Sequence, residues 1–122
     1  MSRDDVPDEA EVLKVRLRQD LRDAMVAREP VRVRVLRLLV SALDNAQAVP
    51  VASEHKSYVV RAFGDPSVEV PRLSLTPDAV RRLLASEIAA RDAAAAELAG
   101  VGRLEQADVL HQEARIIGAY LG

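Results

Sequence analysis

Apolar and polar residues alternate along most of this chain with the period of an α-helix. In the first such stretch, residues 10–28, one face carries the apolar side chains Leu13, Leu17, Leu21, Ala24 and Met25. The other faces carry charged residues, among them Lys14, Arg16, Arg18, Arg22 and Asp23. This stripe predicts an amphipathic helix with one buried side.

The second stretch, residues 31–49, carries two competing periods. Valine and arginine alternate over 31–35 as in a strand, but a longer helical stripe runs on to residue 46. That stripe is Val35, Leu36, Leu39, Leu43 and Ala46. Pro30 breaks the preceding helix and suits the first position of the next one. We predict a second helix, because its first turns can absorb so short an alternation.

Two further helices are predicted in the second half of the chain. Thr76 can cap the free amides of a helix start, Pro77 suits the first helical position, and Asp78 favours the positive end of the helix. The stripe that follows is Val80, Leu83, Leu84, Ile88, Arg91, Ala95 and Leu98. Residues 100–102, Gly-Val-Gly, stop this helix, and Arg103 begins another. The buried stripe of the last helix is Leu104, Ala107, Leu110 or His111, Ala114, Ile117 and Leu121.

Between the second and third predicted helices, residues 50–75 show no helical period. Pro50, Pro66 and Pro71 interrupt this stretch, and residues 64–66 form a turn signal. The flanks of that turn contain Val, Tyr and Phe, which favour strands, so a short β-hairpin within 58–70 is one interpretation. A long irregular loop is the interpretation we favour, and loops of this length are often functional or disordered.

These patterns predict an all-α fold of two helical hairpins, about four helices in all, within one domain over residues 1–122. The first hairpin spans 10–49, the loop 50–75 and the second hairpin 76–122. With apolar residues at 49% and aromatics at only 2%, the core must be built from aliphatic side chains. The residues expected to be largely buried are Leu17, Leu21, Leu36, Leu39, Leu43, Leu84, Ile88 and Ile117.

Charge and composition exclude several classes of protein. A net charge of −2 argues against a generic nucleic-acid binder, which is usually basic. The absence of cysteine excludes disulfides and fits a reducing cytoplasm, where we expect the protein to reside. Residues 1–10 are acidic and lack the apolar core of a signal peptide, and we expect no membrane span.

Basic residues are concentrated around the turn between the first two predicted helices. Residues 10–48 contain eight Lys or Arg against five Asp or Glu, whereas residues 73–122 contain five against seven. The basic group is Arg28, Arg32, Arg34 and Arg37. Their guanidinium groups are candidates for binding RNA phosphates. The interpretation we favour is that they are solvated or pair with acids of the second hairpin, namely Glu87, Glu97 or Glu113.

Residues that could carry chemistry are few and isolated. His55 and His111 have no acids at zinc-binding spacing, so we expect neither a metal site nor a cofactor. Ser41 and Ser86 lie inside predicted helices and lack the sharp turn that exposes a nucleophilic serine. The sequence therefore favours a protein without catalytic activity of its own.

Four segments, in order along the chain, resemble those of the GatB/YqeY family. The first is AMVAR at 24–28, and the second is VLRLL at 35–39 followed by ALDNA at 42–46. The third is LTPDAV at 75–80, with Glu87, Ile88 and Arg91 farther along the same helix. The fourth is the Gly-Arg turn at 102–103 followed by EARI at 113–116 and by Tyr120 and Leu121. Together they cover most of residues 12–49 and 73–121.

The resemblance implies an all-α protein related to the C-terminal region of the B subunit of glutamyl/aspartyl-tRNA amidotransferase. In that enzyme the region helps to hold tRNA, and the chemistry lies elsewhere. Stand-alone members are linked to carbon–nitrogen ligase activity by analogy. This chain has Ala89 where the family usually has lysine, and its middle loop is longer. The family ordinarily continues beyond the position of Gly122 into a small helical bundle, so the resemblance is to a short form.

Taken together, the sequence suggests a non-catalytic accessory or binding module whose partner is tRNA or an amidotransferase-like complex. The four turn arginines are its candidate RNA ligands. The alternative is a protein-interaction module, or a self-association module that forms a homo-oligomer through the alanine-rich third helix, with no role for RNA. An independent amidotransferase ranks third, because no residue supplies a glutaminase nucleophile or a nucleotide site.

Overall fold

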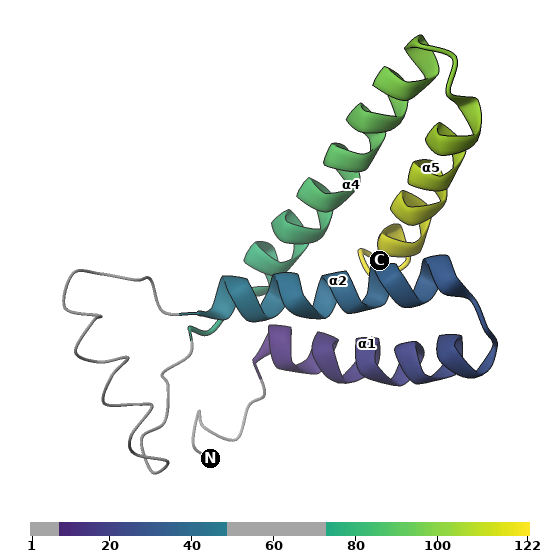
Figure 1. The fold of residues 1–122 in the computed structure, drawn as a ribbon. Helices are drawn as coiled ribbons and strands as arrows, with labels where there is room; N and C mark the ends of the chain where they lie inside the picture. Colours follow the sequence, from purple (N-terminus) through teal and green to yellow (C-terminus); the bar gives the residue numbers. More distant parts are fainter. Residues whose placement is uncertain (1–7, 49–72) are drawn as a thin grey trace, which may run out of the picture.

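A computed structural model describes residues 8–48 and 73–122, which form four helices. These are α1 (Glu9–Val26), α2 (Pro30–Gln47), α4 (Pro77–Gly100) and α5 (Leu104–Gly118). Helices α1 and α2 form one antiparallel hairpin, and α4 and α5 form a second that stands at a steep angle to the first (Figure 1). The predicted all-α fold of two helical hairpins is confirmed for the described residues. Most of the predicted 50–75 loop, and the possible β-hairpin at 58–70, lie outside them.

The two hairpins meet where the start of α4 and the end of α5 pack against the first hairpin. Helix α2 contacts α5, and α1 contacts α4, whereas the turn between α4 and α5 lies far from the first hairpin (Figure 1). The start of α4 is fixed as the sequence predicts. The Oγ of Thr76 accepts a hydrogen bond of 3.0 Å from the Ala79 amide, and Pro77 opens the helix.

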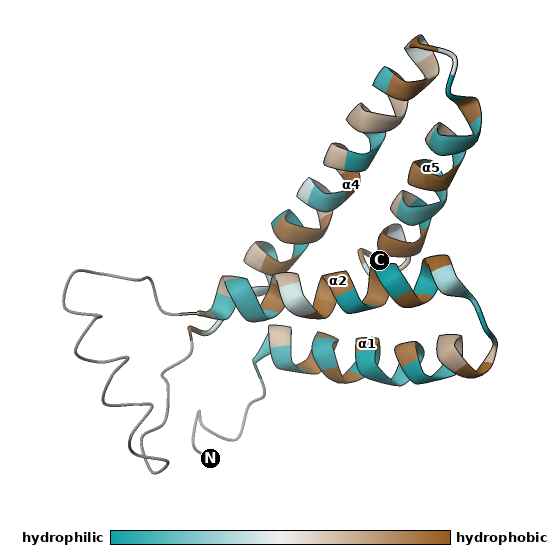
Figure 2. Ribbon diagram, viewed as in Figure 1, coloured by the Kyte–Doolittle hydropathy of each residue, from teal (hydrophilic) through white to brown (hydrophobic). Residues whose placement is uncertain are grey.

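Aliphatic side chains form the core at the junction of the two hairpins. Six of the eight residues predicted to be buried are fully so: Leu17, Leu36, Leu39, Leu43, Leu84 and Ile117. Leu21 and Ile88 are only partly buried and pack against the edge of this core, because the second hairpin covers just part of the first. Apolar and polar positions follow one another along each helix at helical spacing (Figure 2).

Lys14 corrects the sequence analysis, which placed it on a solvent-facing side of the first helix. Its side chain is 1% exposed, and its ammonium group lies 2.8 Å from Asp44 and 2.9 Å from Glu11. Burial by itself lowers the pKa of Lys14, but the hydrogen bonds to Asp44 and Glu11 outweigh it and hold the pKa above its usual value. The long aliphatic stem of lysine packs like an apolar side chain, which a stripe of residue types does not reveal.

A further polar contact ties the first hairpin to the start of the second. The side-chain Nε2 of Gln47 donates hydrogen bonds to the carboxylates of Asp8, at 3.0 Å, and Glu11, at 2.9 Å. Asp8 also accepts a bond of 2.9 Å from the Leu75 backbone amide, just before α4. The end of α2 and the approach to α4 are therefore both held on the start of α1.

Candidate anion-binding site between the first two helices

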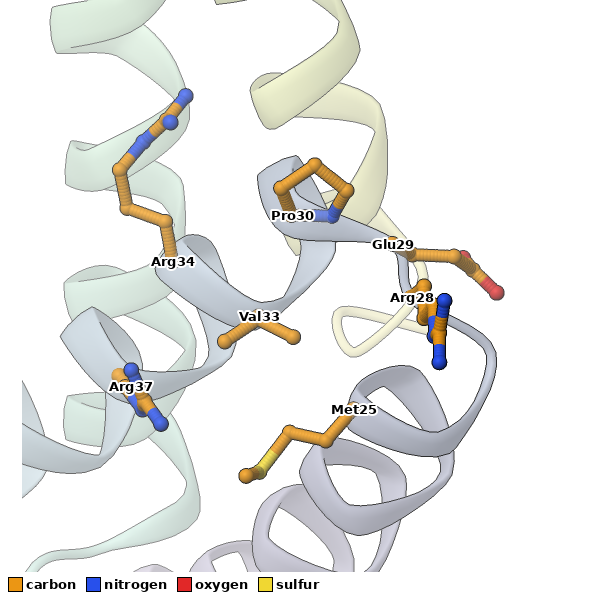
Figure 3. A pocket seen from close by; sticks show the side chains of 7 residues that line it. All are labelled: Met25, Arg28, Glu29, Pro30, Val33, Arg34 and Arg37. Carbon is orange, nitrogen blue, oxygen red and sulfur yellow. The ribbon is translucent and has the colours of Figure 1, made fainter.

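An open hollow of about 770 Å³ lies beside the turn between α1 and α2. Its lining residues are Met25, Arg28, Glu29, Pro30, Val33, Arg34 and Arg37 (Figure 3). Met25 on α1 and Val33 on α2 are the flexible and the branched apolar side chains of this lining, and they give the hollow an apolar floor. Arginines surround this floor. We refer to these seven residues as the arginine hollow.

The position of Arg28 follows from the way in which α1 ends. The amide of Glu29 donates a 3.0 Å hydrogen bond to the carbonyl of Ala24, and the amide of Arg28 donates one of 3.2 Å to Met25. This pair of bonds is the Schellman motif, which needs a left-handed residue one position beyond the helix cap. Arg28 takes that position with φ of 57° and is the only non-glycine residue with positive φ in the described ranges. The backbone thereby fixes where its side chain begins.

Arg28 and Arg37 have exposed side chains without a counter-ion. Within residues 8–48 and 73–122, neither guanidinium has a hydrogen-bond or ion-pair partner. Arg28 comes from the turn and Arg37 from the second full turn of α2, and they lie on opposite sides of Met25 (Figure 3). Two unpaired guanidinium groups beside a concave surface can each donate several hydrogen bonds to an anion.

Arg34 also lines the arginine hollow, but its guanidinium points away from Met25 toward the second hairpin (Figure 3). Its Nη2 lies 2.6 Å from an oxygen of Glu113 on α5. The alternative raised from the sequence, that turn arginines pair with acids of the second hairpin, therefore holds for Arg34 with Glu113. Among the described contacts, Glu87 pairs instead with Arg91, and Glu97 takes no part in an ion pair.

Glu113 is shared between two arginines. Its other oxygen accepts a 2.9 Å bond from Nε of Arg91, and both side chains are nearly buried, at 10% and 11% exposure. Arg91 in turn binds the carboxylate of Glu87 at 2.8 Å and the Glu87 carbonyl at 3.0 Å. The helical stripe placed Arg91 on the buried face of the third predicted helix, but it did not reveal this network.

Arg32 does not belong to the arginine hollow. It lies on another side of α2, where it lines a smaller hollow with Gln112 and Ile116 of α5. Its charge also acts on Tyr120, a buried residue after α5 whose hydroxyl donates a hydrogen bond to Asp20. Burial and the bond to Asp20 raise the pKa of Tyr120 to about 12, and Arg32 and Arg16 only partly oppose this rise. The four predicted arginines thus divide between two surfaces.

The described serine and histidine side chains, which the sequence analysis considered for catalysis or metal binding, lie away from the arginine hollow. Ser41 and Ser86 are exposed on α2 and α4, and Nδ1 of His111 lies 3.5 Å from a carboxylate oxygen of Asp92. No group of three metal-ligating side chains occurs in the part of the chain that the structure describes. His55 lies outside that part. No helix in the two described ranges has the length and hydrophobicity that a membrane span requires.

Comparisons with known proteins do not assign the chain to a family. No family model matches it, and no significant match was found among curated proteins or solved structures.

Proposed function

We propose that this chain is a non-catalytic accessory module that holds tRNA by its phosphates at the arginine hollow. The observation that carries this proposal is Arg28, a charged side chain that occupies a left-handed backbone position without an ion-pair partner in the described residues. A non-glycine residue in this conformation costs about 1 kcal/mol. Backbone strain of this kind clusters at functional sites, where the side chain is used. The resemblance to the GatB/YqeY family supplies the choice of tRNA.

The lining of the arginine hollow suits binding better than catalysis. Arg28 and Arg37 offer fixed positive charge, and Met25 and Val33 offer apolar contact to a sugar or base. Glu29 is the one carboxylate among the seven lining residues, and none of them is a serine, cysteine, histidine or lysine. Few phosphate contacts are available, so we expect weak binding without base specificity, with a salt dependence of about one unit of slope per contact.

The test is a titration of the protein with total tRNA at two salt concentrations. The variant Arg28→Ala/Arg37→Ala should weaken binding to every tRNA alike and flatten the salt dependence by about one unit of slope per lost contact. The matched control is Arg82→Ala/Arg103→Ala, which removes the same charge from exposed positions of the second hairpin. The proposal is wrong if wild-type protein does not bind tRNA, or if the control variant weakens binding as much.

A protein partner is the second candidate, because apolar side chains are exposed at the same turn. Met25 is 50% exposed and Val26 is 85% exposed, so a partner that covered them would gain apolar contact that a phosphate does not provide. Sedimentation velocity distinguishes self-association from the monomer. A discrete oligomer that forms without tRNA, and is broken by Val26→Ser, would favour this candidate.

A further inference from the structure

Arg34 and Glu113 form an ion pair whose two members lie in different surroundings. The side chain of Arg34 is 58% exposed, whereas that of Glu113 is 10% exposed. Arg34 lines the arginine hollow from α2, and only its guanidinium reaches out to α5 (Figure 3). The contact with Glu113 therefore holds the guanidinium of Arg34 away from the surface on which the guanidinium groups of Arg28 and Arg37 are exposed.

Glu113 does not depend on Arg34 for its charge to be balanced. Arg91 holds its second carboxylate oxygen at 2.9 Å, and Arg91 is itself fixed by two bonds to Glu87. If Arg34 moved away, Glu113 would keep a nearly buried, charge-assisted partner rather than become an isolated buried charge. Of the two ion pairs that Glu113 makes, the one with Arg34 can therefore break while the one with Arg91 remains. A partly exposed ion pair such as that with Arg34 is weak.

We propose that Arg34 is a third phosphate ligand of the arginine hollow. In this reserve role, Arg34 stays paired with Glu113 until the anion binds and then moves to the phosphate. This inference rests on the proposed function. A phosphate bound at the arginine hollow, where Arg28 and Arg37 lie, attracts the guanidinium of Arg34. The phosphate and Glu113 then compete for this guanidinium. Because the competing partner lies on α5, binding at the hollow also weakens one of the contacts between the two hairpins, and by reciprocity a looser contact favours binding.

The test compares tRNA binding by wild-type protein and by Glu113→Gln. Glutamine keeps an oxygen for Arg91 but removes the charge that holds Arg34. We expect Glu113→Gln to bind tRNA about fivefold more tightly, the scale of one partly exposed ion pair, with a salt dependence steeper by about one unit of slope. Glu105→Gln is the matched control, because it makes the same change of net charge at an exposed position near the far end of the second hairpin. It should bind as the wild type does.

The double variant Arg34→Ala/Glu113→Gln links the gain to Arg34. It should lose the tighter binding and bind no better than Arg34→Ala. If Glu113→Gln binds like the wild type while Arg28→Ala/Arg37→Ala binds poorly, the reserve role of Arg34 is wrong and the proposed function stands. If Glu113→Gln binds tightly and wild-type binding is absent, Arg34 is a ligand and the unmodified chain is not a tRNA binder. If neither protein binds, both proposals fail.

A direct observation of Arg34 complements the affinities. In ¹⁵N-labelled protein, the side-chain Nε–H resonance of Arg34, assigned with Arg34→Lys, should shift when tRNA is added. The Nε–H resonance of Arg91 should shift less, since Arg91 keeps both Glu113 and Glu87. A resonance of Arg34 that is unchanged at saturating tRNA would show that it stays on Glu113.

Discussion

The turns of the two hairpins share one backbone geometry but differ in the residue at its strained position. In the first turn the amide of Glu29 bonds to Ala24, and in the second the amide of Arg103 bonds to Leu98 at 2.9 Å. The left-handed residue is Arg28 in the first turn and Gly102, with φ of 79°, in the second. Glycine adopts this conformation without steric cost, whereas arginine does not. Only the second turn therefore has the residue that adopts the left-handed conformation without strain.

The proposed function gives a reason for this difference between the two turns. Nothing lies within 4 Å of the position that a Cβ would occupy at Gly102, so backbone conformation rather than space favours glycine there. Arg28 has the same conformation beside a hollow lined by Arg34 and Arg37. Arginine in this conformation costs folding free energy, which is the basis of the proposed function.

The shared core and the far end of the second hairpin differ in burial, and one truncation in each makes this difference measurable. Leu39→Ala, in the fully buried core of the first hairpin, should lower the free energy of unfolding by about 2–5 kcal/mol. Leu104, at the far end of the second hairpin, was predicted to be buried but is 62% exposed, because no part of the first hairpin reaches this end. Leu104→Ala should therefore change stability by about 0.5 kcal/mol or less. Urea unfolding monitored by circular dichroism measures both. Equal effects would mean that the core does not lie where α2 meets the second hairpin.

The Tyr120 contact tests how firmly the second hairpin is held on the first. Because burial and Asp20 raise the pKa of Tyr120 to about 12 from its ordinary 10, the folded protein keeps a proton that the unfolded chain loses. The stability from this contact is complete below pH 10 and is lost as the pH rises toward 12, by about 1–3 kcal/mol. Lys14, whose pKa is also raised, loses its contribution in the alkaline range too.

Unfolding free energies between pH 9 and pH 12 check this expectation. The variant Tyr120→Phe keeps the ring beneath Arg16, whose guanidinium carbon lies 4.6 Å from the ring centre, but has no hydroxyl to titrate. Its stability should fall less steeply than that of the wild type over this range. Parallel profiles for the two proteins would show that burial and Asp20 do not raise the pKa of Tyr120.

The sequence predicted the parts of the fold that depend on local rules. Helical periods located the four helices of residues 8–48 and 73–122, and the residues at the start of α4 predicted its cap at Thr76. The two glycines of residues 100–102 predicted the end of α4, which lies at Gly100. The first turn was located by Pro30, but its geometry could not be predicted, because arginine is a poor residue for the left-handed position that Arg28 occupies.

The candidate site was predicted in part. The concentration of arginines identified the right turn, but helical spacing alone did not show that Arg32 lies on a different surface from Arg28 and Arg37. The pairing of Arg34 with Glu113 was one of two alternatives, since it depends on the angle at which the hairpins cross. The burial of Lys14 was missed because it depends on the packing of α1 against α2, where Glu11 and Asp44 meet its ammonium group, and not on the residue type.

The variant Arg28→Gly tests the central claim most directly, since it removes strain and charge in one step. Its unfolding free energy should rise by about 0.5–1 kcal/mol, as glycine suits the left-handed position. Gly102→Ala is the reciprocal control and should lower stability by about 1 kcal/mol at the second turn without affecting tRNA binding. In the same preparation of Arg28→Gly, tRNA binding should weaken and its salt dependence should flatten by about one unit of slope. A variant that is more stable and binds tRNA as tightly as the wild type would contradict the account, because the strain at residue 28 would then serve no binding function.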